Sequence, residues 1–224
     1  MASSANRTKA SFAARSEIMS VQLAAFQATD LTLRRGHHVV WKDATWRLDA
    51  PTVILGKNGQ GKSSTLAMLA GQLSPIQGEL SLIHHSKAIA PDAWMTSVSL
   101  AAPWVSTPGH LSLSQTLAFH GQFRTPRSGQ RHWERLLLES GLRVGDHVPL
   151  ASWSSGQRQR LSLALALGSE SHVVLLDEPA TNLDTDGIQW LQAQMDIISR
   201  DTLLVVATND QKKEGFQGAS ILEV

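Results

Sequence analysis

A glycine-rich segment that ends in a lysine and a serine limits what this chain can fold into more than any other feature. Residues 56–63 read Gly-Lys-Asn-Gly-Gln-Gly-Lys-Ser and fit the pattern G-x-x-x-x-G-K-S/T. The apolar run before them, 51–55, predicts a short buried strand, and 63–73 predict a helix. A loop in this position turns its backbone N–H groups toward one point, where phosphate binds. The placement favours a phosphate-binding loop over an accidental glycine turn.

The side chains of this loop predict a site for a nucleotide and a metal ion. Lys62 would reach the β and γ phosphates of the nucleotide. Ser63 supplies a hydroxyl for Mg²⁺, a hard cation that takes only a few protein oxygens. The candidate nucleotide-binding residues of the loop are Gly56, Lys57, Asn58, Gly59, Gln60, Gly61, Lys62, Ser63 and Ser64.

Two acidic residues follow a second apolar run. Residues 173–176 predict a strand, and Asp177, Glu178 and Pro179 come directly after it. Next to a phosphate loop, the first acid at the carboxyl end of a parallel strand can hold Mg²⁺ through water, and the second can orient or deprotonate the attacking water. We therefore assign Asp177 to the metal and Glu178 to the water, although such a strand end standing alone is usually a polar turn.

The composition excludes several classes of protein. The chain has 224 residues, a formal net charge of +1 and no cysteine. This length suits one large domain whose core needs no disulfide, and the weak charge argues against a direct nucleic-acid partner. The apolar runs are shorter than the roughly 20 residues that cross a bilayer. Residues 1–20 lack the core of a secretion signal, so we expect a disordered leader or a true start at Met19, with an organelle transit peptide as the alternative.

The remaining pattern is that of an α/β protein. Loosely alternating runs at 21–33 and 41–48 predict an antiparallel opening. Helical spacing dominates the middle of the chain, and the order strand, helix, strand near its end is typical of a parallel sheet with crossover helices. Further strands are expected at 79–83, 98–101, 173–176 and 203–207, and further helices at 114–123, 131–140 and 185–198.

A third motif connects these features to a known family. Residues 153–160 read Trp-Ser-Ser-Gly-Gln-Arg-Gln-Arg. This segment resembles the signature L-S-G-G-Q-x-Q-R of ATP-binding-cassette (ABC) ATPases, and the order phosphate loop, signature, acidic strand end is that family's order. Trp153 replaces the usual leucine and Ser155 the usual glycine, and neither change removes a phosphate donor. The leucine spacing in 161–167 is strand-like, but the signature predicts a buried helix there.

The resemblance covers about 21–224. It implies a P-loop NTPase fold with a mainly parallel core sheet, an antiparallel β subdomain near the N-terminus and a helical subdomain at about 104–165, and it implies ATP and Mg²⁺ as ligands. It also implies a head-to-tail dimer with a second copy or a homologous ATPase subunit. In that dimer a donor-rich helix N-terminus of one subunit would close on the γ-phosphate held by the other. The residues concerned are Ser154, Ser155, Gly156 and Gln157.

Three positions depart from the family's pattern. Asn209 stands where a switch histidine is usual; it can donate a hydrogen bond but cannot accept and pass a proton, and an ordinary turn is an equally supported reading. Residues 101–104 read Ala-Ala-Pro-Trp where the family has its Q-loop glutamine, which bears on the hydrolysis rate and on coupling to a membrane subunit. The adenine-stacking aromatic residue is also missing: 34–38 read Arg-Arg-Gly-His-His. Arg35 or His38 is the candidate substitute, because each has a flat face, with simple solvation as the alternative.

Two further interpretations concern the surroundings of these motifs. Residues 180–184 read Ala-Thr-Asn-Leu-Asp and resemble the family's D-loop, which crosses the dimer interface. The same residues make a good N-cap for the next helix. Trp41 and Trp46 are expected in the core or on an edge strand rather than against a nucleotide.

The leading hypothesis is an ATP-binding and hydrolysing subunit of an ABC transporter, with Glu178 and Asn209 as catalytic residues. It would drive a separate transmembrane permease subunit and lie in the cytoplasm against the inner face of the cell membrane. Short single cassettes of this kind are similar to the small ATP-binding subunits of export systems, including the cytochrome c maturation group. The alternative is a nucleotide-binding regulatory or assembly module with vestigial hydrolysis, in line with the missing histidine and glutamine. A soluble cassette acting on DNA or ribosomes and a phosphate-loop kinase are weaker alternatives.

Overall fold

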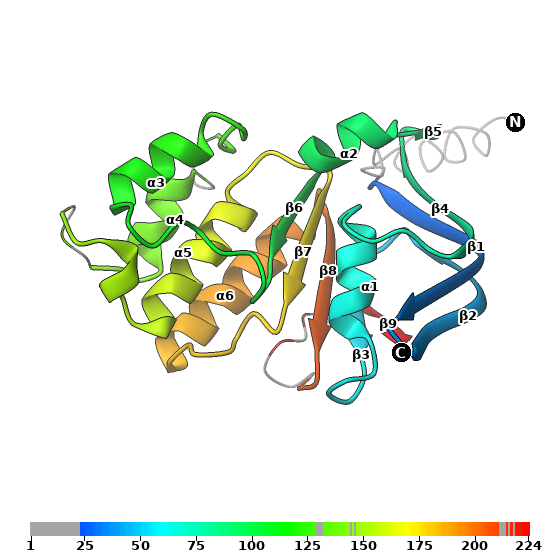
Figure 1. The fold of residues 1–224 in the computed structure, drawn as a ribbon. Helices are drawn as coiled ribbons and strands as arrows, with labels where there is room; N and C mark the ends of the chain where they lie inside the picture. The colour runs from blue at the N-terminus through cyan, green and yellow to red at the C-terminus, as the bar shows by residue number, and fades with distance from the viewer. Residues whose placement is uncertain are drawn as a thin grey trace, which may run out of the picture.

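The structure is a computed structural model that describes residues 23–128, 132–143, 145, 147–210, 214, 216 and 218–224. The expectations for 1–20 lie outside these residues. The described part contains one parallel and one antiparallel sheet with helices packed around them (Figure 1). This arrangement confirms the predicted α/β class.

The core sheet has five strands in the order β6-β7-β8-β3-β9, and every neighbouring pair in it is parallel. Each residue of β7 and β8 is buried, which explains why both strands read as unbroken apolar runs. The carboxyl ends of β3, β7 and β8 meet at one edge of the sheet, where the phosphate loop also lies. The strands span Thr52–Leu55 (β3), Val98–Ala101 (β6), Val173–Asp177 (β7), Leu203–Thr208 (β8) and Ser220–Glu223 (β9).

The antiparallel sheet is built mainly from the first part of the chain and has the order β2-β1-β4-β5. The second residue of β4 is a glycine that the packing requires: a Cβ on Gly78, whose φ is +73°, would lie 2.2 Å from the carbonyl oxygen of Asp30. The predicted antiparallel opening is therefore present: β1 begins and ends later than the expected 21–33, and β2 begins earlier than the expected 41–48. The strands span Ala25–Arg35 (β1), His38–Leu48 (β2), Gln77–His84 (β4) and Lys87–Ala88 (β5).

Helices cover both faces of the core sheet. Leu66 and Leu69 of α1 pack with Val173 and Val205 on one face, while α4, α5 and α6 share a core with Leu176, Leu204 and their neighbours on the other (Figure 1). The helices span Lys62–Leu69 (α1), Pro91–Ser97 (α2), Leu113–His120 (α3), Trp133–Glu139 (α4), Ser155–Leu167 (α5) and Thr185–Ile198 (α6), and a 3₁₀ turn spans Leu150–Ser152.

Several boundaries differ from the sequence-based expectation. The helix expected at 63–73 ends at Leu69, because Gly71 takes a left-handed φ of +74° that closes it. The helices expected at 114–123 and 131–140 are shorter at one or both ends. Helix α2 and strands β5 and β9 were not expected, since each is short and carries little periodicity.

The segment 161–167 is the helix that the signature predicts, not the strand that its leucine spacing indicates. Leu161, Leu163 and Leu165 are buried, and so are Ala164, Ala166 and Leu167 between and after them. A helix enclosed on nearly all sides shows no amphipathic period, so its pattern cannot separate it from a strand. Among the described residues, no helix is long and apolar enough to cross a membrane.

Candidate nucleotide-binding site

The glycine-rich loop runs from the end of β3 into α1 and is fixed by close packing. Gly61 is the N-cap of α1 with φ at +118°, and a Cβ there would lie 2.4 Å from Cγ1 of Val40 on β2. Only glycine fits both this backbone conformation and this space. The antiparallel sheet thus packs directly on the loop, and Trp41 adds a 2.9 Å hydrogen bond from its Nε1 to Thr65 Oγ1.

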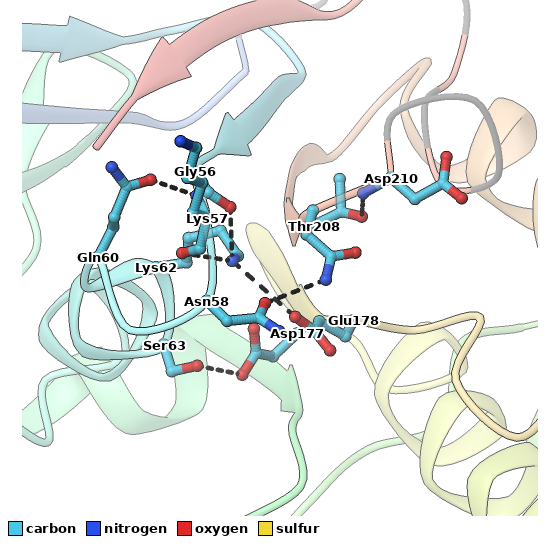
Figure 2. A network of polar contacts seen from close by, with 11 residues as sticks. Gly56, Lys57, Asn58, Gln60, Lys62, Ser63, Asp177, Glu178, Thr208 and Asp210 are labelled. Carbon is cyan, nitrogen blue, oxygen red and sulfur yellow. Dashed lines mark hydrogen bonds and ion pairs between the residues drawn. The ribbon is translucent and has the colours of Figure 1, made fainter.

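Lys62 points back along the loop (Figure 2). Its ammonium donates hydrogen bonds to the carbonyl oxygens of Gly56 at 2.8 Å and Lys57 at 3.3 Å, and its Nζ lies 3.9 Å from Glu178 Oε1. The side chain is only 5% exposed. The positive charge is therefore held between the loop and the acidic end of β7.

Ser63 and Asp177 are brought together across the sheet edge, although they are far apart in sequence. The hydroxyl of Ser63 donates a 2.7 Å hydrogen bond to Asp177 Oδ2 (Figure 2). Asp177 is 4% exposed, and its other oxygen, Oδ1, is buried without a hydrogen-bond partner. Burial raises the pKa of Asp177, with Glu178 adding to the rise, while the hydrogen bond from Ser63 and the charge of Lys62 oppose it. A hard cation beside Oδ1 would satisfy this orphaned oxygen, so the residues present fit Mg²⁺.

Glu178 follows Asp177 in a strained backbone conformation. Its φ is +44°, and its N–H donates to the carbonyl oxygen of Ala207 at 2.8 Å. A left-handed φ is costly for a residue with a side chain and is typical of functional sites. The carboxylate is about one-third exposed and lies on the rim of a pocket of about 410 Å³. The lining of this pocket is Arg35, Asn58, Gly59, Gly61, Lys62, Ser63, Ser64, Pro103, Asp177 and Glu178.

Asn209 lies beside the loop, directly after β8. Its amide Nδ2 donates a 3.0 Å hydrogen bond to Asn58 Oδ1. The neighbouring Asp210 N–H donates to Thr208 Oγ1 at 2.9 Å and closes the turn (Figure 2). The structure thus gives Asn209 a defined contact with the phosphate loop. Pro103, from the segment where the family has its glutamine, lines the pocket without offering a hydrogen-bonding side chain.

The two residues proposed to replace the stacking aromatic lie against the same loop. Arg35 lines the phosphate pocket, and its Nη1 is 3.4 Å from Ser64 Oγ. His38 has its Nε2 3.3 Å from the carbonyl oxygen of Gln60. Trp41 and Trp46 lie on the edge strand β2, with ring centroids 5.9 Å apart and partly buried, as expected.

The signature forms a separate surface at the start of α5. Ser154 caps the helix: its Oγ accepts from Gln157 N–H at 3.1 Å, and Gln157 Oε1 accepts from Ser154 N–H at 2.9 Å. All four signature residues line a second hollow of about 740 Å³, together with Asn182 and Asp184. Among the described residues, the lining of the phosphate pocket includes none of the four. A further pocket of about 540 Å³ is lined by both Ser155 and Glu178. In the part of the chain that the structure describes, none of these three pockets is lined by both the signature and residues 56–64 of the phosphate loop.

The segment 180–184 joins the acidic strand end to α6 and serves as the cap that its sequence predicts. Asp184 Oδ1 accepts from Gly187 N–H at 2.8 Å and pairs with Arg160 of α5. A Cβ on Gly156 would lie 2.7 Å from the carbonyl oxygen of Asn182, so the signature helix begins in close contact with this segment.

Sequence reasoning missed three residues near the site. Val40 lay between the two expected strands, Pro103 marked only a missing glutamine, and Glu214 lay in a polar stretch without periodicity. Glu214 is 4% exposed and accepts a 2.6 Å hydrogen bond from Ala180 N–H. No pattern in the sequence identifies a buried acid in such a stretch.

Comparison with known proteins places the chain. The family described as ABC transporter matches residues 43–181, which is more than half of the chain. The cytochrome c biogenesis ATP-binding export protein CcmA of Paramagnetospirillum magneticum is 33% identical over 75% of this chain and 79% of its own length.

Two solved structures share the fold. A bacterial Atm1-family ABC exporter with ATP bound superposes with a TM-score of 0.74 at 15% identity, over 91% of this chain and 37% of that one. A dimeric ATP-binding cassette in a post-hydrolysis state, bound to ADP and Pi, superposes with a TM-score of 0.67 at 19% identity, over 84% of this chain and 90% of that one. Together with the family match, these findings show that the chain belongs to the ABC transporter family, as one of its ATP-binding ATPase subunits.

Proposed function

We propose that this chain hydrolyses ATP as part of a head-to-tail dimer, formed with a second copy or a homologous ATPase subunit, and so drives separate membrane subunits. The observation that carries the proposal is the separation, within one chain, of a phosphate pocket and a signature surface. The pocket holds Lys62, Ser63, Asp177 and Glu178, while the signature lines its own hollow. A second subunit that brings its signature to the pocket would complete the site.

In this proposal the loop and the acidic strand end divide the work. Backbone N–H groups of 56–64 and the ammonium of Lys62 bind the phosphates. Ser63 Oγ and Asp177 would hold Mg²⁺, which supplies neutralisation of the charge that develops on the phosphate oxygens.

Glu178 is the residue placed to act on water. Its partly exposed carboxylate would orient a water molecule and accept its proton as the water oxygen bonds to the γ-phosphorus and the bond to ADP breaks. Asn209 can donate a hydrogen bond there but cannot take the proton. Proton acceptance therefore rests on Glu178, and Asn209 contributes through its contact with Asn58.

The partner subunit would supply the start of its α5. Ser154, Ser155, Gly156 and Gln157 form a helix N-terminus with small side chains, and such a terminus attracts the negative γ-phosphate. The partner's helix N-terminus would then contact the γ-phosphate on the side that the phosphate loop leaves open.

We place the membrane subunit against the helical part of the chain, at about 104–165. Phe119 and Phe123 are 46% and 64% exposed there, and their ring centroids lie 5.3 Å apart. Trp104, at the start of this part, is 41% exposed and donates from its Nε1 to Gln72 Oε1. Exposed aromatic residues in a group mark a surface that a partner covers. Through such a contact the chain would lie on the cytoplasmic face of the membrane. The relative CcmA is named for export in cytochrome c biogenesis, and export is accordingly the direction we propose.

A mixture of two inactive variants tests the composite site. Lys62→Ala removes the phosphate contact. Ser155→Asp places a negative charge where the partner's γ-phosphate would lie, and it spares the fold because an acid is favourable in the first turn of a helix. Each variant alone should lose ATP hydrolysis.

Mixed in equal amounts, the two variants should recover up to about a quarter of wild-type turnover, because half of the dimers carry one intact site out of two. The control is the neutral variant Ser155→Ala, mixed with wild type, which changes the same position without adding a charge. A mixture that stays as inactive as its components contradicts the head-to-tail arrangement.

A nucleotide-binding regulatory module remains the second candidate. The observation that favours it is the pair Pro103 and Asn209, which stand in or beside the pocket where the family has a glutamine and a histidine. It predicts ATP binding with a turnover that Glu178→Gln leaves almost unchanged.

A further inference from the structure

Glu214 is a buried acid that the site described above does not use. Its side chain is 4% exposed. Oε1 accepts a 2.6 Å hydrogen bond from the backbone N–H of Ala180, and the hydroxyl of Thr208 also bonds its carboxylate. One side chain therefore joins the last residue of β8 to the first residue of the segment 180–184.

The surroundings of this carboxylate argue that it does more than fill space. Burial raises the pKa of Glu214, the hydrogen bonds from Thr208 and Ala180 lower it, and the charges of Glu178 and Asp210 raise it again. An alanine would leave the N–H of Ala180 buried without a partner, which is costly. A side chain that only filled space at this position could be apolar and would need no hydrogen bonds.

The two segments that Glu214 joins lead to the two halves of the proposed composite site. On one side, Thr208 is followed by Asn209, whose amide bonds Asn58 of the phosphate loop. On the other side, 180–184 continues to Asn182 and Asp184, which line the hollow that holds the signature. The contacts of Asn209 and Glu214, together with the backbone between them, thus connect the phosphate loop with the signature surface.

We propose that Glu214 is a positioning residue that ties the end of β8 to the segment 180–184, so that the signature surface responds when nucleotide binds at the phosphate loop. This inference rests on the proposed function. Glu214 lines neither the phosphate pocket nor the signature hollow, and it acts through Ala180 and Thr208.

Hydrogen exchange measured by mass spectrometry tests the tie without requiring turnover. In wild type, Mg-ATP should slow exchange in peptides covering both 56–64 and 180–184. Glu214→Ala should keep the protection at 56–64 and lose the change at 180–184. Glu214→Gln should behave like wild type, because its Oε1 still accepts from Ala180 and its amide can donate to Thr208 Oγ1. The matched control is Glu170→Ala. Glu170 is an exposed acid, and its hydrogen bond to the carbonyl oxygen of Thr125 comes from its backbone N–H, which the substitution keeps.

Steady-state kinetics supply a second readout. Glu214→Ala should lower kcat about tenfold while KM for Mg-ATP changes less than about twofold, because a misplaced segment affects the reacting geometry rather than phosphate binding. Glu214→Gln should restore most of kcat.

Two results would overturn the inference: an ATP-dependent change at 180–184 that persists in Glu214→Ala, or a Glu214→Gln variant as defective as alanine. Failure of the proposed function looks different. In that case wild type itself shows no ATP-dependent protection at 56–64, or hydrolysis survives Lys62→Ala.

Discussion

Lys62, Ser63, Asp177 and Glu178 meet in one pocket although two come from the start of α1 and two from the end of β7. Their contacts are internally consistent: Ser63 bonds Asp177 and Lys62 faces Glu178. The unpartnered Asp177 Oδ1 is the one buried polar atom of this group that no protein atom satisfies. In our proposal a metal ion beside Oδ1 would satisfy this oxygen.

At the residue scale, Arg35 gives a sharp prediction. Its guanidinium lines the phosphate pocket and lies 3.4 Å from Ser64 Oγ, so we expect it to contact phosphate oxygens rather than stack on the base. Arg35→Ala should weaken ATP binding by about 1 kcal/mol, or about fivefold in Kd. Fluorescence titration with ATP measures this effect.

The control variants at Arg35 distinguish a charged contact with phosphate from stacking of a flat side chain on the base. Arg35→Lys should recover most of the affinity if the contact is with phosphate, and the adjacent exposed Arg34→Ala should change little. Recovery by Arg35→Tyr but not by Arg35→Lys contradicts the phosphate contact and supports stacking on the base.

The sequence singles out the loop and acidic residues that line the pocket, because they follow local spacing patterns. Gly61 and Lys62 are recognisable in any P-loop pattern, and an apolar strand that ends in Asp177 and Glu178 is equally plain. Pro103 and Glu214 reach their positions near the site only through tertiary packing, and no local sequence pattern predicts these positions.

At the element scale, the helical part of the chain is joined to the core by a partly buried histidine. His120 at the end of α3 has its Nε2 3.0 Å from Ser169 Oγ, and its ring meets that of Trp133 of α4 edge-on at 4.8 Å. Burial, aided by the charge of Arg124, lowers the pKa of His120 to about 4.

This histidine predicts an acid-dependent loss of stability. Because its folded-state pKa lies below the unfolded value of about 6.5, unfolding takes up a proton between these values, so its contribution is complete above pH 6.5 and is lost as pH falls toward 4. The full shift corresponds to about 3 kcal/mol, and partial exposure reduces the expected loss to about 1–2 kcal/mol.

Urea denaturation at pH 7.5, 6 and 4.5 measures this loss. His120→Gln should flatten the decline in unfolding free energy by that amount, whereas the exposed His110→Gln should leave it unchanged. Equal slopes for wild type and His120→Gln would show that another group controls the acid limb.

Helices and strands were predictable from the sequence where the pattern of apolar residues matches the way the element is buried. Strands β7 and β8 were evident as apolar runs, since parallel strands are covered on both faces. Helix α5 was not evident from its own residues, because burial all round removes the helical period and leaves an accidental alternation of leucine. Its identity came from the resemblance of residues 153–160 to the family's signature. The short β5 and β9 carry too few residues for any period to emerge.

At the scale of the whole molecule, the parallel sheet and the antiparallel sheet meet at the phosphate loop. Val40 of β2 packs on Gly61, and Trp41 bonds Thr65 of α1. The helical part carries the signature away from this loop, into its own hollow beside Asp184. The overall order of motifs was predictable from sequence, but the placement of the phosphate loop and the signature in different hollows required the structure.

The most direct test of the account is the rate of Mg-ATP hydrolysis per chain, measured over a range of protein concentrations. Turnover per chain should rise with concentration, since a complete site in the proposed dimer needs two chains, and Lys62→Ala and Glu178→Gln should both abolish it. Glu178→Gln should also hold the dimer together in ATP, as seen by light scattering, because ATP binds but the water is no longer deprotonated. A turnover per chain that is independent of concentration, together with a Glu178→Gln variant that stays monomeric in ATP, would contradict it.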